Sequence, residues 1–217
     1  MRNALILAAV VALAAPAYAQ NAGVGSAGQT PRSELRSFGY ARLGYGGAAA
    51  DGFRSAPAIG FGYRAELESF ALDVSFFNFI VRADPYETGR DVFAGSTLRL
   101  QALHFLDAEG DRSPYVGAGL SWGGVGVSRG SSGATYSNSW SGSGLQGELT
   151  AGYELTRNTP MRMFIQTDIG LPFFKAKSAS YSVTRTPDGF IRPASLEERY
   201  IPSAVVSLGI GWQRHRR

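Results

Sequence analysis

The sequence has no cysteine and only two histidines in 217 residues, His104 and His215. Without cysteine there is neither a disulfide nor a lipid-modified N-terminal cysteine. Hydrolases of lipids or peptides need a histidine with serine or acidic neighbours, and neither histidine has such a setting. Metal-ligand spacing, phosphate-binding glycine turns and a carboxylate pair are equally missing. We therefore expect no catalytic residue, no cofactor-binding residue and no metal ligand, and a structural position for His104 near a strand end.

Charged residues are scarce, at 18% of the chain, and the formal charge of +4 is localised. Without Arg2, 20 basic residues face 17 acidic ones, and without the three arginines of residues 213–217 the balance is 17 to 17. The basicity therefore belongs to a short C-terminal tail, which argues against a nucleic-acid partner. The tail is either a solvated end or a contact for anionic headgroups and cell-wall polymers.

Long hydrophobic runs are also missing, apart from the twelve residues Ala4–Ala15. A membrane-spanning helix needs about 20 residues, so an N-terminal anchor is the weaker interpretation. Arg2 before this run and Ala17-Tyr18-Ala19 after it form the pattern of a secretory signal peptide. We expect residues 1–19 to be removed before Gln20, and residues 20–37, which lack periodicity, to be a flexible leader.

Glycine (28 residues) and aromatic residues (12%) are abundant, and they alternate along predicted strands. In residues 203–212 one face carries Ala204, Val206, Leu208, Ile210 and Trp212. The other face is made of small residues, which suits the crowded interior of a closed barrel. A strand this close to the C-terminus needs partners on both edges. We expect it to close a barrel by pairing with the first strand.

Alternation of apolar and small or polar residues predicts eight strands in all. They cover residues 38–46, 57–66, 70–77, 96–105, 114–122, 145–155, 161–171 and 203–212. The alternation breaks down at Leu103-His104-Phe105, where we expect a bulge. Two long stretches, residues 128–143 and 177–199, are interpreted as loops.

One turn assignment makes the second and third strands agree in detail. If Glu68-Ser69 is a two-residue turn, Leu67 meets Phe70 on the apolar face. On the other face Arg64 meets Asp73, and Gly60 leaves room for Phe77. Opposite charges and complementary sizes therefore favour this register.

The charged residues of the strands lie on the face opposite the apolar one. They are Arg42, Arg64, Glu66, Asp73, Arg99, Glu148, Glu154, Arg162 and Asp168. Polar inside and apolar outside is the membrane arrangement, and the short connections after strands two, four and six fit it. The sequence thus predicts an all-β protein, an eight-stranded antiparallel up-and-down transmembrane β-barrel over residues 38–212. The inner charges are either a polar path for a solute or, as we favour, a network that plugs the lumen.

Three segments carry a family resemblance: P-Y-V-G-A-G at residues 114–119, A-G-Y-E-L at 151–155 and L-G-I-G-W at 208–212. The chain resembles the eight-stranded outer-membrane barrels of the opacity-type and OmpA-like group. The resemblance implies localisation in the outer membrane. It also implies that the aromatic-ended last strand is recognised by the outer-membrane assembly machinery, although five residues follow Trp212 here.

We expect a non-enzymatic, monomeric outer-membrane barrel that displays four surface loops for surface contact, adhesion or envelope integrity. Its partners would be outer-membrane lipid, the assembly machinery and a possible ligand at the third loop, which carries Tyr136 and Trp140. Two alternatives remain open. One is an outer-membrane barrel enzyme acting on lipid; the other is a secreted lipocalin-like ligand binder, which needs an apolar lumen.

Overall fold

A computed structural model describes residues 36–49, 53–79, 91–129, 136–182 and 192–213, and their regular structure is entirely β. The strands are β1 (Arg36–Ala49), β2 (Phe53–Leu67), β3 (Phe70–Phe79), β4 (Asp91–Phe105), β5 (Ser113–Arg129), β6 (Tyr136–Glu154), β7 (Met161–Pro172), β8 (Ala176–Ser182), β9 (Arg192–Arg199) and β10 (Ser203–Gln213). Within these ranges, no helix is long and apolar enough to cross a membrane.

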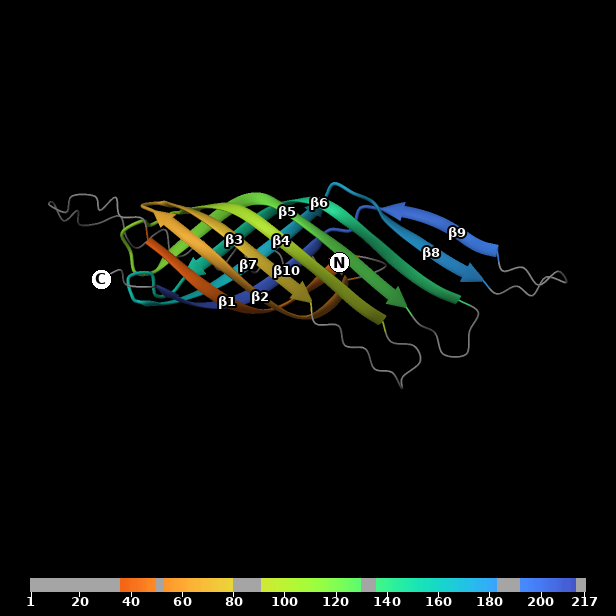
Figure 1. Cartoon of the computed structure of the whole chain (residues 1–217), viewed down its shortest axis with the longest axis horizontal. Coiled ribbons are helices and arrows are strands. Elements are labelled where there is room, and N and C mark those ends of the chain that lie inside the picture. Colours follow the sequence, from red (N-terminus) through yellow and green to blue (C-terminus); the bar gives the residue numbers. More distant parts are fainter. Residues whose placement is uncertain (1–35, 50–52, 80–90, 130–135, 183–191, 214–217) are drawn as a thin grey trace.

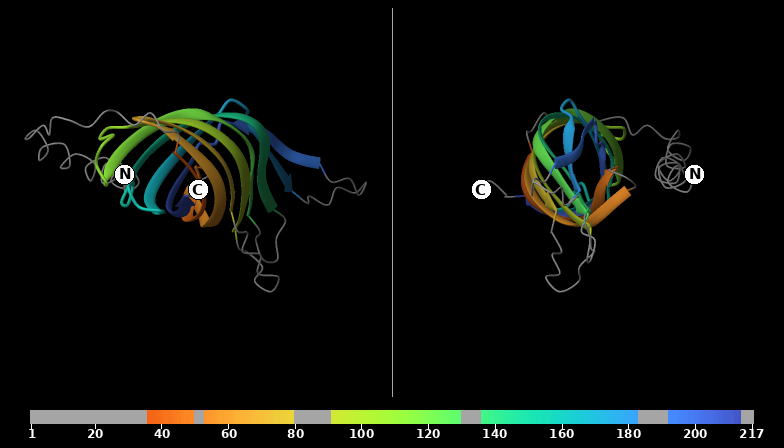
Figure 2. Two further views of the ribbon diagram at one scale, coloured as in Figure 1. Left: turned by 60° about the vertical axis from the view of Figure 1, so that its left-hand side comes forward. Right: turned by 90° about the vertical axis from the view of Figure 1, so that its right-hand side faces the viewer.

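Eight of the strands close into an antiparallel barrel, as predicted (Figure 1). Each strand from β1 to β7 pairs with its neighbour in sequence, β10 pairs with β7, and β10 also pairs with β1 to complete the ring. The remaining two strands, β8 and β9, form a hairpin that pairs through β8 with the N-terminal residues 136–141 of β6. Figure 2 shows the closed ring when the molecule is seen along its length. The last strand therefore has partners on both edges, which removes the exposed edge that a free terminal strand would have.

The strand register fixes the tilt of the barrel. Directly paired residues can be followed around the ring from Leu67 of β2 through His104 and Thr167 back to Pro57 of the same strand. The path returns ten residues from its start, as the two residue numbers show. In an eight-stranded barrel this stagger corresponds to strands tilted by about 40°.

Three short connections lie at one end, which we call the turn end: residues 68–69, 106–112 and 155–160. The first is the predicted two-residue hairpin, and Glu68 adopts a φ of 51°, the left-handed conformation that such tight turns require. The predicted register is confirmed, because Leu67 pairs with Phe70, Arg64 with Asp73 and Gly60 with Phe77.

Some sequence predictions need correction. The bulge at residues 103–105 is absent, since Leu103, His104 and Phe105 pair without a shift with Gly117, Val116 and Tyr115. Leu103 and Phe105 are apolar residues that face inward near the turn end, which is why the alternation looked broken. Several strands are also longer than expected. At the first and last strands, β1 begins at Arg36 and β10 includes Gln213, while β2 begins at Phe53, β4 begins at Asp91 and β5 continues to Arg129.

Two further corrections concern predicted loops. Residues 136–143 continue β6, which runs for 19 residues, and residues 177–199 contain most of the β8–β9 hairpin. These strands were missed because serine, glycine and alanine occupy most positions of residues 136–143 and of β8, while charged residues occupy half of β9, so no apolar alternation marks them. The signal peptide and most of the leader and tail lie outside the described residues.

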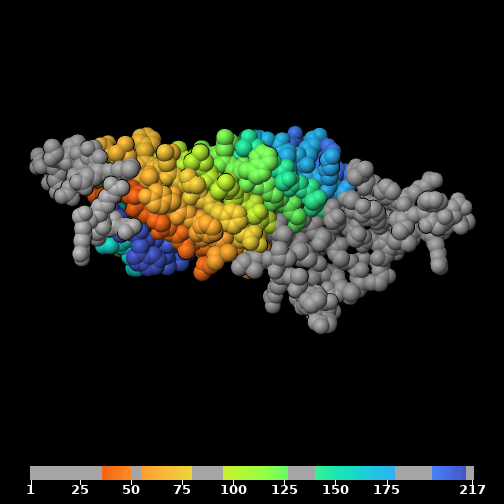
Figure 3. Space-filling model, viewed as in Figure 1, coloured from red at the N-terminus to blue at the C-terminus, as the bar shows by residue number. Residues whose placement is uncertain are grey.

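The outer wall of the barrel is apolar. Every barrel strand carries large exposed hydrophobic residues on its outward face, including Leu43 on β1, Phe61 on β2, Leu100 on β4 and Leu149 on β6. Neighbouring strands cross the face seen in Figure 3 as diagonal bands whose side chains lie in contact. A surface of this kind is unsuited to water and matches the hydrocarbon interior of a bilayer.

Candidate functional site

The barrel interior, here called the lumen, contains a balanced set of buried charges. Among the described residues, five arginines and five acidic residues are buried: Arg42, Arg64, Arg99, Arg157 and Arg162, with Glu66, Asp73, Glu148, Glu154 and Asp168. All nine inner charges predicted from the sequence lie in this set. The tenth, Arg157, is on the turn between β6 and β7 and was not predicted. Buried charges are costly unless they are paired, so their partners decide what the lumen can do.

Asp168 on β7 is the centre of the first group of contacts. One carboxylate oxygen accepts hydrogen bonds from Arg42 at 3.1 Å and from Arg99 at 2.7 Å. The other accepts from Thr150 and Gln166, both at 2.7 Å. With four donors from four strands, the negative charge of this carboxylate is balanced by two arginines and both of its oxygens are hydrogen-bonded. Asp168 therefore connects opposite sides of the barrel.

Arg64 on β2 is the centre of the second group. Its Nε donates to Asp73 at 2.9 Å, and its Nη2 donates to Gln166 at 3.1 Å. Asp73 also accepts a hydrogen bond from the hydroxyl of Tyr40 at 2.6 Å. Four aromatic rings lie within 6 Å of the Arg64 guanidinium, with Phe164 nearest at 4.5 Å. Ring faces attract such a cation, which adds to the pairing with Asp73.

A third group lies nearer the turn end, where arginines and glutamates alternate. Arg162 donates to Glu154 at 2.8 Å and to Glu66 at 3.5 Å. Glu154 also lies 3.9 Å from Arg64, which joins this group to the second one. Gln166 in turn bonds both Arg64 and Asp168, so the three groups form one network from side to side.

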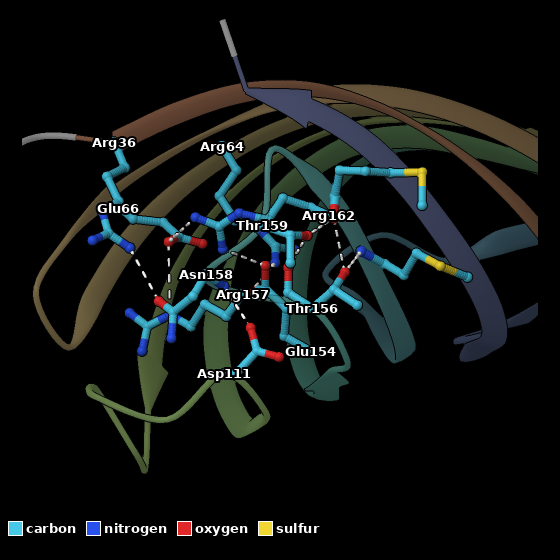
Figure 4. A network of polar contacts seen from close by, with 12 residues as sticks. Arg36, Arg64, Glu66, Asp111, Glu154, Thr156, Arg157, Asn158, Thr159 and Arg162 are labelled. Atoms are coloured by element: carbon cyan, nitrogen blue, oxygen red, sulfur yellow. Dashed lines mark hydrogen bonds and ion pairs between the residues drawn. The ribbon is translucent and has the colours of Figure 1, made fainter. Parts of the chain in front are cut away.

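Arg157 ends the network at the turn end (Figure 4). Its Nη1 donates to the carbonyl oxygens of Asp107 at 3.0 Å and Ala108 at 2.6 Å, and its Nη2 donates to the carbonyl oxygen of Glu68 at 2.6 Å. Its Nε lies 3.7 Å from a Glu66 carboxylate oxygen. Burial lowers the pKa of Arg157 from its ordinary value, while the Glu66 carboxylate opposes that change. One side chain thus links all three turns.

Apolar layers pack against the charged network in the lumen. Near the turn end Leu103, Phe105 and Tyr115 pack with Ala71. Toward the far end, opposite the turn end, a larger buried cluster contains Phe77, Phe79, Trp140, Ile201 and Val205. A third cluster of Phe38, Tyr40 and Phe164 lies beside Arg64, and the Tyr115 hydroxyl donates to Gln166 at 2.9 Å. Apolar and charged side chains therefore pack against each other in the lumen.

The residues singled out from the sequence for chemistry do not gather in the lumen. His104 points outward from β4, with its ring centroid 4.8 Å from that of Phe70. Trp140, expected on a surface loop, is buried inside the far end. Tyr136 is in β6, and its side chain and His215 lie outside the described residues. In the part of the chain that the structure describes, no group of three His, Cys, Asp or Glu residues could hold a metal ion.

Comparison with known proteins gives structural similarity alone, since no family model and no curated protein matches the sequence. Neisserial surface protein A superposes with a TM-score of 0.50 at 14% identity, covering 82% of this chain and 97% of that one. Ail, the attachment invasion locus protein of Yersinia pestis, has a TM-score of 0.49 at 17% identity and covers 83% of this chain and 99% of its own. Together with the closed ring, the apolar wall and the charged lumen, the first of these similarities shows that the chain has the fold of an eight-stranded outer-membrane β-barrel, the architecture of the opacity-type and OmpA-like group that its strand motifs resemble.

Proposed function

We propose that this protein is a non-enzymatic, monomeric outer-membrane barrel whose lumen is plugged by its own side chains and whose far end serves surface contact, adhesion or envelope integrity. The observation that carries the proposal is the lumen itself: five buried arginines matched by five buried acids in one connected network. Side chains just fill the interior of an eight-stranded barrel, so such a network leaves no continuous water path.

The outer wall supports the membrane placement. From Met161 to Leu171 on β7 every outward residue except Thr167 is apolar. Ten residue steps span about 33 Å of strand, or about 25 Å along the axis of a barrel with this tilt, which matches the apolar band of such proteins. Trp122 and Trp212 are outward near the far end and the turn end of the apolar wall, where aromatic girdles lie.

The far end supports a role in surface contact. There β4, β5 and β6 extend past the end of β3, and the β8–β9 hairpin adds to them. Exposed charged residues gather at its base, with Glu198 lying 3.7 Å from Lys175 and 3.8 Å from Lys177. By analogy with barrels whose short turns face the periplasm, this end faces outward from the cell. The aromatic-ended β10 would be the segment that the assembly machinery recognises.

Two alternatives have less support. A lipid-directed enzyme would need His104 beside a nucleophile, but its ring packs against Phe70 on the outer wall. A lipocalin-like binder would need an apolar lumen and a polar exterior, the reverse of the observed arrangement.

The test combines fractionation with a conductance measurement. The protein should be recovered with outer membranes and migrate differently on a gel with and without boiling. In planar bilayers the folded form should show no steady ion current. Recovery in the soluble fraction would contradict the membrane placement, and a stable current would contradict the plug.

A further inference from the structure

Arg157 occupies an unusual position for a charged residue on a short turn. It is 4% exposed, and its guanidinium donates to three backbone carbonyls that belong to the two other turns. Its guanidinium carbon lies 4.0 Å from the centroid of the Phe105 ring, a member of the apolar layer beneath it. A planar guanidinium suits this task, because its donors point in fixed directions and it stacks flat on an aromatic ring.

The surrounding contacts repeat the same link between turns. The backbone N–H of Arg157 donates to the carbonyl oxygen of Asp111 at 2.7 Å, and that of Asn158 donates to the Asp111 carboxylate at 2.8 Å. Behind the guanidinium lies Glu66, whose carboxylate also bonds Arg162 in the main network. The side chain thus stands between the outside of the turn end and the first buried charges of the lumen.

We propose that Arg157 is a latch that closes the turn end of the lumen, and that its release admits water and small ions to the buried Glu66–Arg162–Glu154 group. This inference rests on the proposed plug, of which the latch is the removable part. The three carbonyls that hold it are backbone atoms of tight turns, so they remain as a cage for a guanidinium when the side chain is withdrawn. The latch is a conformational device and has no catalytic role.

The absence of native cysteine allows a direct accessibility test. Ala71 faces inward beneath the latch and contacts the Phe105 layer, and cysteine there adds only one sulfur atom. The Ala71→Cys protein is folded in detergent micelles and treated with a small cationic methanethiosulfonate. Labelling is scored only in the folded band of an unheated gel. The same reporter is then combined with Arg157→Ala, and with Arg112→Ala as a matched control, since Arg112 is an exposed arginine on the turn between β4 and β5.

Arg157→Ala should label at least about tenfold faster than the reporter alone, the change expected from losing one charged hydrogen-bonded contact in the closed state. Arg112→Ala should leave the rate unchanged. Free guanidinium, well below denaturing concentrations, should slow labelling of Arg157→Ala again, whereas tetramethylammonium, which cannot donate hydrogen bonds, should not. Arg157→Lys, which keeps the charge but not the planar donors, should also label faster and replaces Arg157→Ala if that variant fails to fold.

The outcomes separate the latch from the plug. Equal labelling of the Arg157 variants and the reporter alone would overturn the latch while leaving the plug intact. Fast labelling of the reporter with Arg157 present would instead overturn the plug, and the latch with it. Acceleration by Arg112→Ala to the same degree would also overturn the latch, because it would show that any loss of charge at this end opens the lumen.

Discussion

At the scale of single residues, the lumen is held by pairs in which neither partner is replaceable alone. Arg64 and Asp73 are the clearest case, because they are directly paired across β2 and β3 and both are fully buried. Removing one leaves the other charged in a place that water does not reach. Removing both leaves no unpaired charge of this pair, although Tyr40 loses its acceptor, Gln166 loses a donor and Glu154 loses a nearby cation.

We therefore predict strong coupling between these two residues. Asp73→Ala should destabilise the barrel by about 3–5 kcal/mol, the usual effect of breaking a buried pair. Arg64→Ala plus Asp73→Ala should cost much less than the two single changes summed. A double-mutant cycle in urea, followed by the folded band on an unheated gel, measures the difference. Strict additivity would mean that the two side chains do not meet.

Glycines supply the space that the inward rings need. Gly209 on β10 lies against the buried ring of Phe164, and an added methyl group would overlap that ring. Gly209→Ala should therefore destabilise by about 1–3 kcal/mol, as overpacking does. Gly39→Ala is the control, because a methyl group there points outward and its nearest neighbour is the Gly62 carbonyl oxygen at 3.9 Å. Urea titration of both variants tests this, and adding Phe164→Leu should rescue only Gly209→Ala.

At the scale of elements, strand alternation carries most of the information that the sequence holds. It predicted the eight barrel strands, the Glu68-Ser69 turn and nine of the ten buried charges, because each of these follows from which face a residue occupies. It fails where the outward face stops being apolar. Asn78, Ser96, Gly124 and Ser143 form one directly paired outward row. Past this row, the positions on the same face of β4, β5 and β6 are mostly serine, glycine and alanine.

Arg157 shows the other limit of sequence reasoning. Its partners are backbone carbonyls, and every residue has one, so no residue pattern predicts which turn it will reach. Arg157 reaches these carbonyls only because the three turns lie close together at one end of the barrel. The alternation of residues along the strands does not predict which turns are close.

The depth of a residue on the outer wall should decide its tolerance of charge. Leu149 is midway between Tyr153 and Leu145 on the outward face of β6, and Ser143 lies on the same face beyond the apolar rows. Leu149→Arg should cost about 2–4 kcal/mol on folding into lipid vesicles, whereas Ser143→Arg should be close to neutral. Urea-induced unfolding from vesicles measures both. Equal costs would show that the apolar rows do not lie in the bilayer.

At the scale of the whole molecule, the account depends on one orientation: the apolar face meets lipid and the charged face is enclosed. The fluorescence of the three tryptophans of the chain can test this orientation without an added label. Trp122 and Trp212 are outward and 65% and 63% exposed, while Trp140 is inward and 3% exposed.

The most direct measurement is quenching of single-tryptophan variants by brominated lipid, with the other two tryptophans changed to phenylalanine. After folding into vesicles, Trp122 and Trp212 should be quenched strongly, and more by bromine placed near the headgroups than near the chain ends. Trp140 should keep its fluorescence, because the barrel wall separates it from the lipid. Quenching of Trp140 to the same degree, or no quenching of Trp122 and Trp212, would contradict the membrane-spanning barrel with its enclosed lumen.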